Sequence, residues 1–166
     1  MLRAAEIQIK MPKTVIFDLD GTLADISERM TLALQGSTGK FNWPVFFHPD
    51  NIALDRPNSP VISAYLAMQQ AGFRMVIFSG RVDSTREVTE NWLQSHGITW
   101  DLLKMRSATP PILFMKDDSL KEMWLDEEFP GERIQEIECV FDDRDKVVAM
   151  WRRRGIPCFQ VAPGDF

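Results

Sequence analysis

Two short apolar runs in this sequence each end in a pair of aspartates, and this arrangement restricts the fold more than any other feature. The first run leads into Asp18 and Asp20. The second leads into Asp142 and Asp143. Both runs have the strand-like composition of a buried sheet. Because carboxylates at the ends of buried strands are costly without a positive charge among them, the pattern predicts an acidic cluster with a cation at one edge of a sheet.

Oxygen-rich clusters of this kind suit Mg²⁺, which takes one or two protein carboxylates and leaves room for a phosphate. The aspartates therefore indicate metal-assisted phosphoryl chemistry. A simpler interpretation of Asp142 and Asp143 stays open, because an Asp after a strand is often a helix N-cap or a turn residue. It suits Asp18 and Asp20 poorly, since two carboxylates one residue apart point the same way and Gly21 permits a close backbone approach.

Strand-like and helix-like segments alternate along most of the chain. Strands are expected at 14–18, 74–79, 102–105, 137–141 and 158–161, and helices at 57–71, 84–96, 117–127 and 145–154. Ser84 is expected to cap the second helix, with Glu87 completing a capping box. The alternation predicts an α/β fold, a Rossmann-like parallel sheet of about five strands with helices on both faces. Ligands of such sheets bind beyond the carboxyl ends of the strands, where the aspartates lie.

The segment 24–58 interrupts this alternation and is the least regular part of the sequence. It is too short for a large cap domain, so a small lid or substrate-facing insert is expected. Its aromatic residues at 41–47 are expected to form mainly a satellite core, with one or two available to stack on a base. Residues 1–12 are expected to be an N-terminal extension, and 13–166 a single domain.

The composition disfavours several classes of protein. Hydrophobic residues make up 45% of the 166 residues and no apolar run is long enough to cross a membrane, so a globular protein without a membrane segment is expected. No signal-peptide pattern opens the sequence, and two cysteines are too few for a disulfide framework. A cytoplasmic location with reduced thiols is therefore expected. The net charge of −5 disfavours a protein that coats nucleic-acid duplexes, although bound Mg²⁺ would offset part of it.

The segment Gly36-Ser37-Thr38-Gly39-Lys40 is only superficially similar to a P-loop. It has two residues between its glycines, Phe41 where a P-loop has Ser or Thr, and no strand before it. No nucleoside triphosphate kinase site is expected from this segment.

The motif Asp18-Leu19-Asp20-Gly21-Thr22 resembles the signature Asp-x-Asp-Gly-Thr of the haloacid dehalogenase superfamily. The later parts of that family's pattern follow in order: Phe78-Ser79-Gly80-Arg81, then Lys121, then the pair Asp142 and Asp143. From Lys13 onward, and most densely from Val140 to Phe166, the chain resembles the 3′-phosphatase domain of bacteriophage polynucleotide kinase/phosphatase. The kinase half of those enzymes has no counterpart in this sequence, so 5′-kinase activity is not expected.

This resemblance implies a role for each matched residue. Asp18 would be the nucleophile, and Asp20 the general acid and base, with its pKa raised by neighbouring carboxylates. Lys121 would complete the catalytic set. The implied Mg²⁺ ligands are Asp18, Asp20, Asp142 and Asp143. The implied substrate-binding residues are Arg29, Ser79, Arg81 and Asp117.

Three of these residues have simpler interpretations when each is taken alone. Asp117 and Lys121 have the spacing of an exposed ion pair on a helix, worth a few tenths of a kcal/mol. Arg29 alone would be a solvated surface residue.

The expected function is a Mg²⁺-dependent phosphatase that removes 3′-phosphates from RNA or DNA ends or from 3′-nucleotides. One alternative is a phosphatase of mononucleotides or other small phosphorylated metabolites. A second is an interaction domain without catalysis, which the intact acidic set argues against. No membrane association and no stable protein partner are expected.

Overall fold

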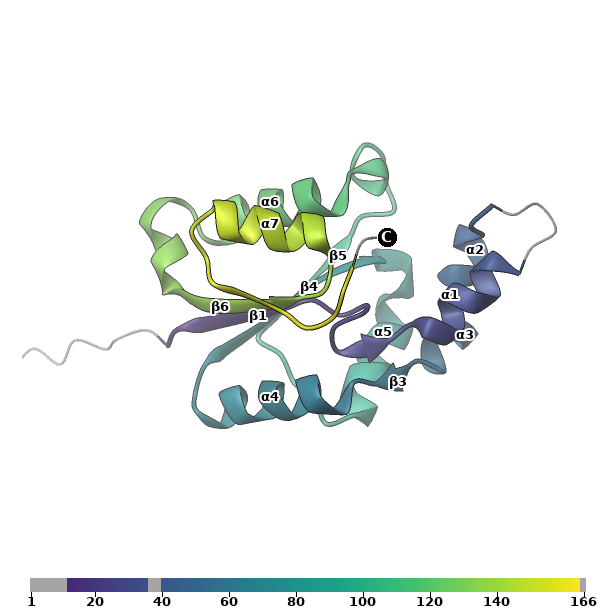
Figure 1. Cartoon of the computed structure of the whole chain (residues 1–166), viewed down its shortest axis with the longest axis horizontal. Coiled ribbons are helices and arrows are strands. Elements are labelled where there is room, and N and C mark those ends of the chain that lie inside the picture. Colours follow the sequence, from purple (N-terminus) through teal and green to yellow (C-terminus); the bar gives the residue numbers. More distant parts are fainter. Residues whose placement is uncertain (1–11, 36–39, 165–166) are drawn as a thin grey trace, which may run out of the picture.

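A computed structural model describes residues 12–35 and 40–164, which surround one central parallel sheet (Figure 1). The strands of the sheet are β1 (Thr14–Phe17), β4 (Arg74–Val82), β5 (Leu102–Arg106), β6 (Ile137–Asp142) and β7 (Cys158–Gln160). Their order is β5-β4-β1-β6-β7, and every neighbouring pair is parallel. After β1 the chain adds β4 and β5 on one side of it, and then β6 and β7 on the other side. The strand order therefore reverses at β1. This reversal is where α/β sheets bind ligands.

Helices cover both faces of the sheet, as the sequence predicts (Figure 1). The covering helices are α4 (Ser59–Gln70), α5 (Arg86–Ser95), α6 (Asp117–Glu128) and α7 (Asp145–Arg153). Short 3₁₀ turns lie at η1 (Asp83–Thr85), η2 (Ile112–Phe114) and η3 (Gly131–Glu136). The Rossmann-like fold class is thus confirmed. No helix in the described ranges is long and apolar enough to cross a bilayer.

Alternation along the central strands divides the buried side chains into two cores. Val15 and Phe17 of β1 join the core on the side of α4 and α5, whereas Ile16 joins the core under α6 and α7. The neighbouring strands repeat the pattern in register, since Ile16 lies beside Val76 of β4 and Val140 of β6. Because both faces are buried, the strands are nearly continuous apolar runs. This packing fixes the register that brings the ends of β1 and β6 together.

The segment between β1 and α4 is more regular than the sequence indicates. It contains β2 (Ala24–Asp25), α1 (Ser27–Leu34), α2 (Trp43–Phe46), α3 (Pro49–Ala53) and β3 (Arg56–Pro57). We call its described part the lid. Antiparallel pairing of β2 with β3 closes the lid at its base, and the lid helices project beyond the sheet (Figure 1). The short lid helices have too few turns for a readable period, which explains why the sequence pattern did not predict them.

The lid aromatics mainly form a core extension, in agreement with the expectation. Phe46 is buried, and Phe41 and Phe47 are partly buried against the main core. Trp43 alone of these four aromatics keeps more than half of its surface exposed, at 56%.

The expected capping box at Ser84 is wrong. Helix α5 begins at Arg86 after the η1 turn, and its N-cap Thr85 makes no side-chain capping bond. The Thr85 hydroxyl instead donates to the carbonyl oxygen of Val82, at 2.8 Å. Strand β4 continues to Val82, where it pairs with Arg106 of β5, so the chain reaches the helix later than expected.

Other differences are at element boundaries. Helix α4 begins at Ser59 because Pro57 belongs to β3. The predicted N-terminal extension over 1–12 lies outside the described residues except for Pro12, and residues 36–39 of the P-loop-like segment also lie outside them.

Candidate active site

Lys121 lies between two buried carboxylates at the carboxyl end of the sheet. Its ammonium donates to Asp18 Oδ1 at 2.6 Å and to Asp142 Oδ2 at 2.7 Å. The backbone N–H of Asp18 donates to the carbonyl oxygen of Phe141 at 2.9 Å, which continues the β1–β6 ladder by one residue. All three charged side chains are nearly inaccessible to solvent. The predicted acidic cluster with a cation is therefore present, and Lys121 is that cation.

Asp143 adds a third carboxylate to this cluster. Carboxylate oxygens of Asp18, Asp142 and Asp143 lie within 4.8 Å of one another, close enough to share one metal ion. Asp143 Oδ1 is buried and has no hydrogen-bond partner among the described residues. A Cβ on Gly21, whose φ is +87°, would lie 2.1 Å from Asp143 Oδ2, so only glycine fits beside this carboxylate. The buried carboxylate of Asp143 thus has one oxygen, Oδ2, enclosed by Gly21 and another, Oδ1, without a hydrogen-bond partner among the described residues.

The charges of the cluster favour a further cation. Burial raises the pKa of Asp18 well above its usual value, against the attraction of Lys121. Burial and the neighbouring Asp142 raise the pKa of Asp143 to about 6. Three carboxylates around one ammonium leave excess negative charge in a desolvated place. A divalent metal ion held by these oxygens would remove that excess, so the donor set fits a hard cation such as Mg²⁺.

The turn interpretation of Asp142 holds only in part. Its Oδ1 accepts the backbone N–H of Arg144 at 3.2 Å, as in a turn, while its Oδ2 binds Lys121. The N-cap of α7 is Arg144 and makes no side-chain capping bond, so neither aspartate caps the helix.

Asp20 lies beside this cluster but is held by arginines. Arg29 of α1 donates to Asp20 Oδ1 at 2.7 Å, and Arg81 of β4 donates to the same oxygen at 2.8 Å. Both guanidinium groups are almost fully buried, so the interpretation of Arg29 as a solvated surface residue is wrong. Burial raises the pKa of Asp20, but Arg81 and Arg29 outweigh it and lower the pKa. The expectation that neighbouring carboxylates raise this pKa is therefore wrong in the structure without substrate.

Asp55, which the sequence analysis did not select, completes this ion-pair network. It follows α3 in the lid, and its two carboxylate oxygens accept from Arg29 at 2.6 Å and from Arg81 at 2.7 Å. Its backbone carbonyl oxygen accepts the indole N–H of Trp92 at 2.8 Å. Burial raises the pKa of Asp55 to about 6 against the two arginines, so it is ionised at neutral pH. The only available signal was indirect, since a buried Arg29 needs more than one acidic partner.

Asp117 also binds arginines in this structure. Arg106 and Arg144 each form a close ion pair with it. It makes no pair with Lys121 one turn later, because Lys121 turns toward Asp18 and Asp142. The helix-surface ion pair that the spacing allows is thus absent, and both residues serve the site edge of the sheet.

Ser79 lies fully buried in β4. Its Oγ accepts the backbone N–H of Arg81 at 3.2 Å, which leaves its hydroxyl hydrogen available as a donor. The structure therefore brings all nine residues predicted for the site to one end of the sheet. They form three groups: the acidic cluster with Lys121, the network of Asp20 with Arg29 and Arg81 next to Ser79, and Asp117 with its two arginine partners.

Comparison with known proteins agrees with this geometry. Residues 12–166 match the family described as the polynucleotide kinase PNKP phosphatase domain, whose fold is of the haloacid dehalogenase type. The chain belongs to this family. It is thus a phosphatase domain, and the resemblance noted from its motifs is confirmed.

Individual relatives support the family. A chain in the structure of the Pnkp1/Rnl/Hen1 RNA repair complex is 35% identical, with a TM-score of 0.74 over 93% of this chain and 44% of that one. A candidate bifunctional polynucleotide kinase/RNA ligase of Autographa californica nuclear polyhedrosis virus is 28% identical over 89% of this chain and 19% of its own length. A dehalogenase structure at 11% identity, with a TM-score of 0.60 over 92% of this chain and 86% of that one, shares the fold. The phosphatase domain therefore spans less than half of these first two relatives.

Replacing Asp55 by alanine should disrupt the site although Asp55 is not among the clustered carboxylates. Among the described residues, the change leaves Asp20 as the one acid that pairs with two buried arginines, so the free energy of unfolding should fall by about 3 to 5 kcal/mol. Because the arginines that hold Asp20 then lose their second anchor, kcat should fall by about 100-fold. Urea unfolding and steady-state phosphate release measure these effects.

Asp50→Ala is the matched control, because Asp50 lies in the same lid with its side chain 89% exposed. It should change stability by less than about 0.5 kcal/mol. Wild-type kcat in Asp55→Ala would contradict the positioning role.

Proposed function

We propose that this phosphatase domain is a Mg²⁺-dependent phosphomonoesterase that acts through an aspartyl-phosphate on Asp18. Its substrates would be 3′-phosphates on polynucleotide ends or 3′-nucleotides. The observation that carries the proposal is the buried contact of Lys121 with both Asp18 and Asp142, beside the unsatisfied Asp143. This arrangement would position the Asp18 carboxylate to attack a phosphate, next to a cation that can neutralise the phosphate charge.

In the first step an oxygen of Asp18 would attack the phosphorus. Lys121 binds Oδ1, which leaves Oδ2 for the new oxygen–phosphorus bond. The bond from phosphorus to the ribose 3′-oxygen breaks, and Asp20 gives that oxygen a proton. Lys121 and the Ser79 hydroxyl would stabilise the non-bridging oxygens, where negative charge builds up.

In the second step water would attack the phosphorus of the aspartyl-phosphate, and Asp20 would take a proton from that water. The bond from phosphorus to Asp18 breaks and frees the carboxylate. The first role requires a protonated Asp20, although Arg29 and Arg81 lower its pKa in the structure without substrate, and the second role requires its carboxylate form. A bound phosphate dianion would oppose the arginines and raise the pKa of Asp20, since nearby like charge disfavours ionisation.

This contact pattern also refines the roles of the arginines. Arg29 and Arg81 both donate hydrogen bonds to Asp20 and Asp55. Arg29 also donates to the Phe46 carbonyl oxygen, and Arg81 to the Thr89 hydroxyl. We therefore assign them first to the positioning of Asp20. Because both guanidinium groups are almost fully buried, direct binding of phosphate by either arginine would require movement of the groups around it.

Asp18, Asp142 and Asp143 would hold the metal ion, with Asp20 contributing from the adjoining turn. Bound Mg²⁺ supplies Lewis-acid stabilisation of phosphate oxygens and screens the nucleophile from the phosphate charge. The same ion would satisfy the unpartnered Asp143 oxygen.

The substrate proposal draws support from family membership and from the relative in an RNA repair complex. The domain covers 44% of that relative's chain, so polymer specificity is a separate part of the proposal. The runner-up is a phosphatase of small phosphorylated metabolites, which would use the same chemistry.

Chelation tests the metal. Activity should vanish with EDTA and return with Mg²⁺, and Mg²⁺ at about 100 times its Kd should stabilise the wild-type fold by about 2.7 kcal/mol. Asp143→Asn should not destabilise the metal-free protein, because it removes one of the clustered buried negative charges, but it should reduce the stabilisation by Mg²⁺.

Asp145→Asn is the control for thermal unfolding with and without Mg²⁺, because Asp145 lies two residues further on with an exposed side chain. It should retain the full effect of Mg²⁺. Full activity after complete chelation would rule out the metal.

Asp18→Asn should abolish turnover and leave the fold intact, since the amide has nearly the shape of the carboxylate but little nucleophilicity. Phosphate release and circular dichroism measure the two effects. Asp101→Asn is a matched control, because Asp101 accepts the Met75 N–H at 2.7 Å at the opposite end of the sheet. Turnover near wild type in Asp18→Asn would contradict covalent catalysis.

A substrate panel tests the position of the phosphate. With Mg²⁺, the domain should release phosphate from 3′-phosphorylated oligonucleotides and nucleoside 3′-monophosphates, and much more slowly from the matching 5′-phosphates. Efficient release from 5′-phosphates or sugar phosphates, with 3′-phosphates untouched, would contradict the substrate assignment.

A further inference from the structure

A cavity of about 730 Å³ lies directly beside the acidic cluster. The catalytic roles assigned above do not use it. Asp143 and Gly21 line its inner end. Its walls come from three separate segments: α1 of the lid, the start of α4 and the chain after β7. We call this cavity the shelf. Its volume falls within the range of pockets that hold small organic molecules.

The walls of the shelf combine apolar side chains with neutral polar ones and two acids. Met30, Pro60 and Pro163 supply apolar surface, and Ser59 supplies a hydroxyl. The acids are Asp25 and Asp143, and the described lining contains no lysine or arginine. Such walls suit a flat, neutral ring, since a thioether contacts aromatic rings favourably. Away from Asp143, which would hold the metal ion, the described lining offers no cation for a phosphate and includes the carboxylate of Asp25.

We propose that the shelf binds the nucleoside, sugar and base, of the nucleotide whose 3′-phosphate is removed. This inference rests on the proposed function and specifies its substrate. The phosphate would lie beside Asp143, with Asp18 and Lys121, and the neutral nucleoside would extend along the neutral polar and apolar walls. Recognition would then depend on one nucleotide unit, whether free or at the end of a chain.

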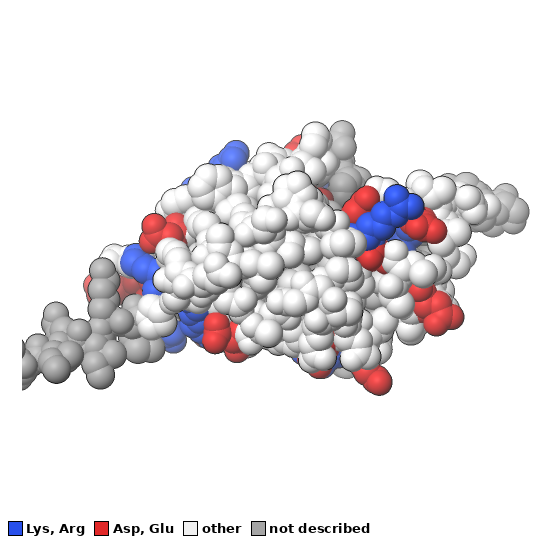
Figure 2. All heavy atoms as spheres, turned by 90° about the horizontal axis from the view of Figure 1, so that it is seen from below, with Lys and Arg blue, Asp and Glu red and all other residues white. Residues whose placement is uncertain are grey.

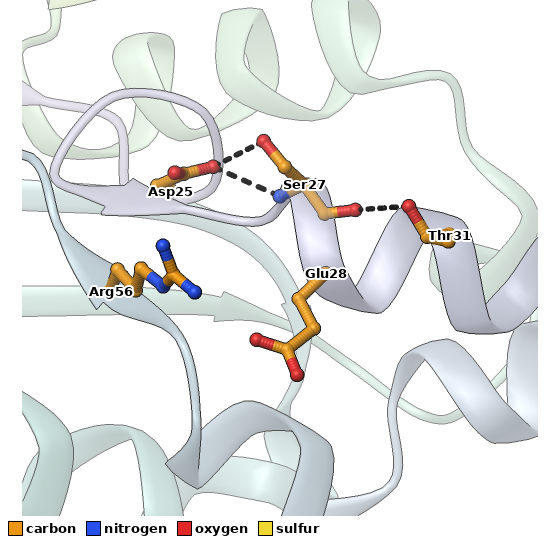
Figure 3. A pocket seen from close by; sticks show the side chains of 5 residues that line it. All are labelled: Asp25, Ser27, Glu28, Thr31 and Arg56. Carbon is orange, nitrogen blue, oxygen red and sulfur yellow. Dashed lines mark hydrogen bonds between the residues drawn. The ribbon is translucent and has the colours of Figure 1, made fainter.

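A smaller hollow next to the shelf explains why further phosphates should contribute little. It has a volume of about 320 Å³ and shares Asp25 and Ser27 with the shelf. Arg56 is the one cation in its described lining, and Figure 3 shows Arg56 and Glu28 reaching into the same hollow. Ser27 donates its backbone N–H to Asp25 Oδ1 at 3.0 Å, and Figure 3 shows its hydroxyl on the same oxygen. Hydrogen bonds from Ser27 lower the pKa of Asp25, so this carboxylate is charged. With two acids against one arginine, the hollow does not attract a second phosphate.

One face of the molecule gives the same indication. The face in Figure 2 is largely uncharged, with acidic and basic side chains scattered together near its edges. It carries no basic stripe of the kind that follows a nucleic-acid backbone. A contact confined to the terminal nucleotide is consistent with this face.

Filling the shelf tests the inference. Ala162 lines the shelf and is not part of the catalytic set, so Ala162→Phe should occupy the space of the base. We expect KM for adenosine 3′-monophosphate to rise by at least about tenfold, as when a pocket loses its fit to a substrate. Hydrolysis of acetyl phosphate, which has no nucleoside, should stay within about twofold of wild type. Acetyl phosphate therefore also reports whether the variant folds.

The matched control is Ala71→Phe, because Ala71 is exposed at the far end of α4 and does not line the shelf. It should behave as wild type with both substrates. If Ala162→Phe also loses acetyl phosphate hydrolysis, Ser59→Phe on the opposite wall decides the matter by the same two measurements. An unchanged KM for the 3′-nucleotide, in a variant that hydrolyses acetyl phosphate normally, would overturn the proposal that the shelf binds the nucleoside.

Substrate length supplies a second arm. Wild-type kcat/KM should differ by no more than a few-fold between adenosine 3′-monophosphate and a 3′-phosphorylated decanucleotide, with a shallow dependence on salt. A strong preference for the decanucleotide that disappears at high salt would overturn recognition of a single nucleotide. Failure of the proposed function looks different: wild-type protein would hydrolyse acetyl phosphate but release nothing from either 3′-phosphate.

Discussion

The ammonium of Lys121 allows two strands of this sheet to end side by side in buried carboxylates. It contacts Asp18 after β1 and Asp142 at the end of β6, each within 2.7 Å. Without it, two adjacent desolvated negative charges would oppose the pairing of the strands. Lys121 makes no hydrogen bond to Asp143, whose buried Oδ1 has no hydrogen-bond partner in the described part of the chain. One cation thus balances part of the buried negative charge, and the excess that remains is the basis of the proposed metal and phosphate chemistry.

A second network ties the lid to the sheet. Asp55 and Arg29 belong to the lid, whereas Arg81 belongs to β4 and Asp20 follows β1. Because each arginine binds both acids, movement of the lid would change the position of Asp20. The network therefore links the part of the molecule that covers the site to the group that would transfer the proton. It also explains why two arginines of a phosphatase domain are buried and satisfied before any substrate binds.

The sequence predicted the sheet well because both faces of each central strand are buried. Such strands, like the one around Ile16, are continuous apolar runs that are easily recognised in a sequence. It predicted the aspartates because their motifs are local, whereas Lys121 was assigned through the resemblance to the haloacid dehalogenase superfamily, since its spacing alone indicated an exposed ion pair. It did not predict Asp55, since nothing nearby marks it and its two partners each lie 26 residues away. It also missed the effect of the arginines on Asp20. Proximity of carboxylates can be inferred from strand ends, but the pairing of a side chain across the lid depends on tertiary packing.

The central claim is that Asp18 carries the phosphate during turnover. The most direct measurement is rapid quenching of wild-type protein with a 3′-phosphorylated oligonucleotide and Mg²⁺, followed by borohydride trapping and peptide mass spectrometry. The account predicts modification of Asp18 within the peptide that contains Asp20, at a level that rises and falls with turnover. Steady phosphate release without any trapped species, or trapping at another residue, would contradict it.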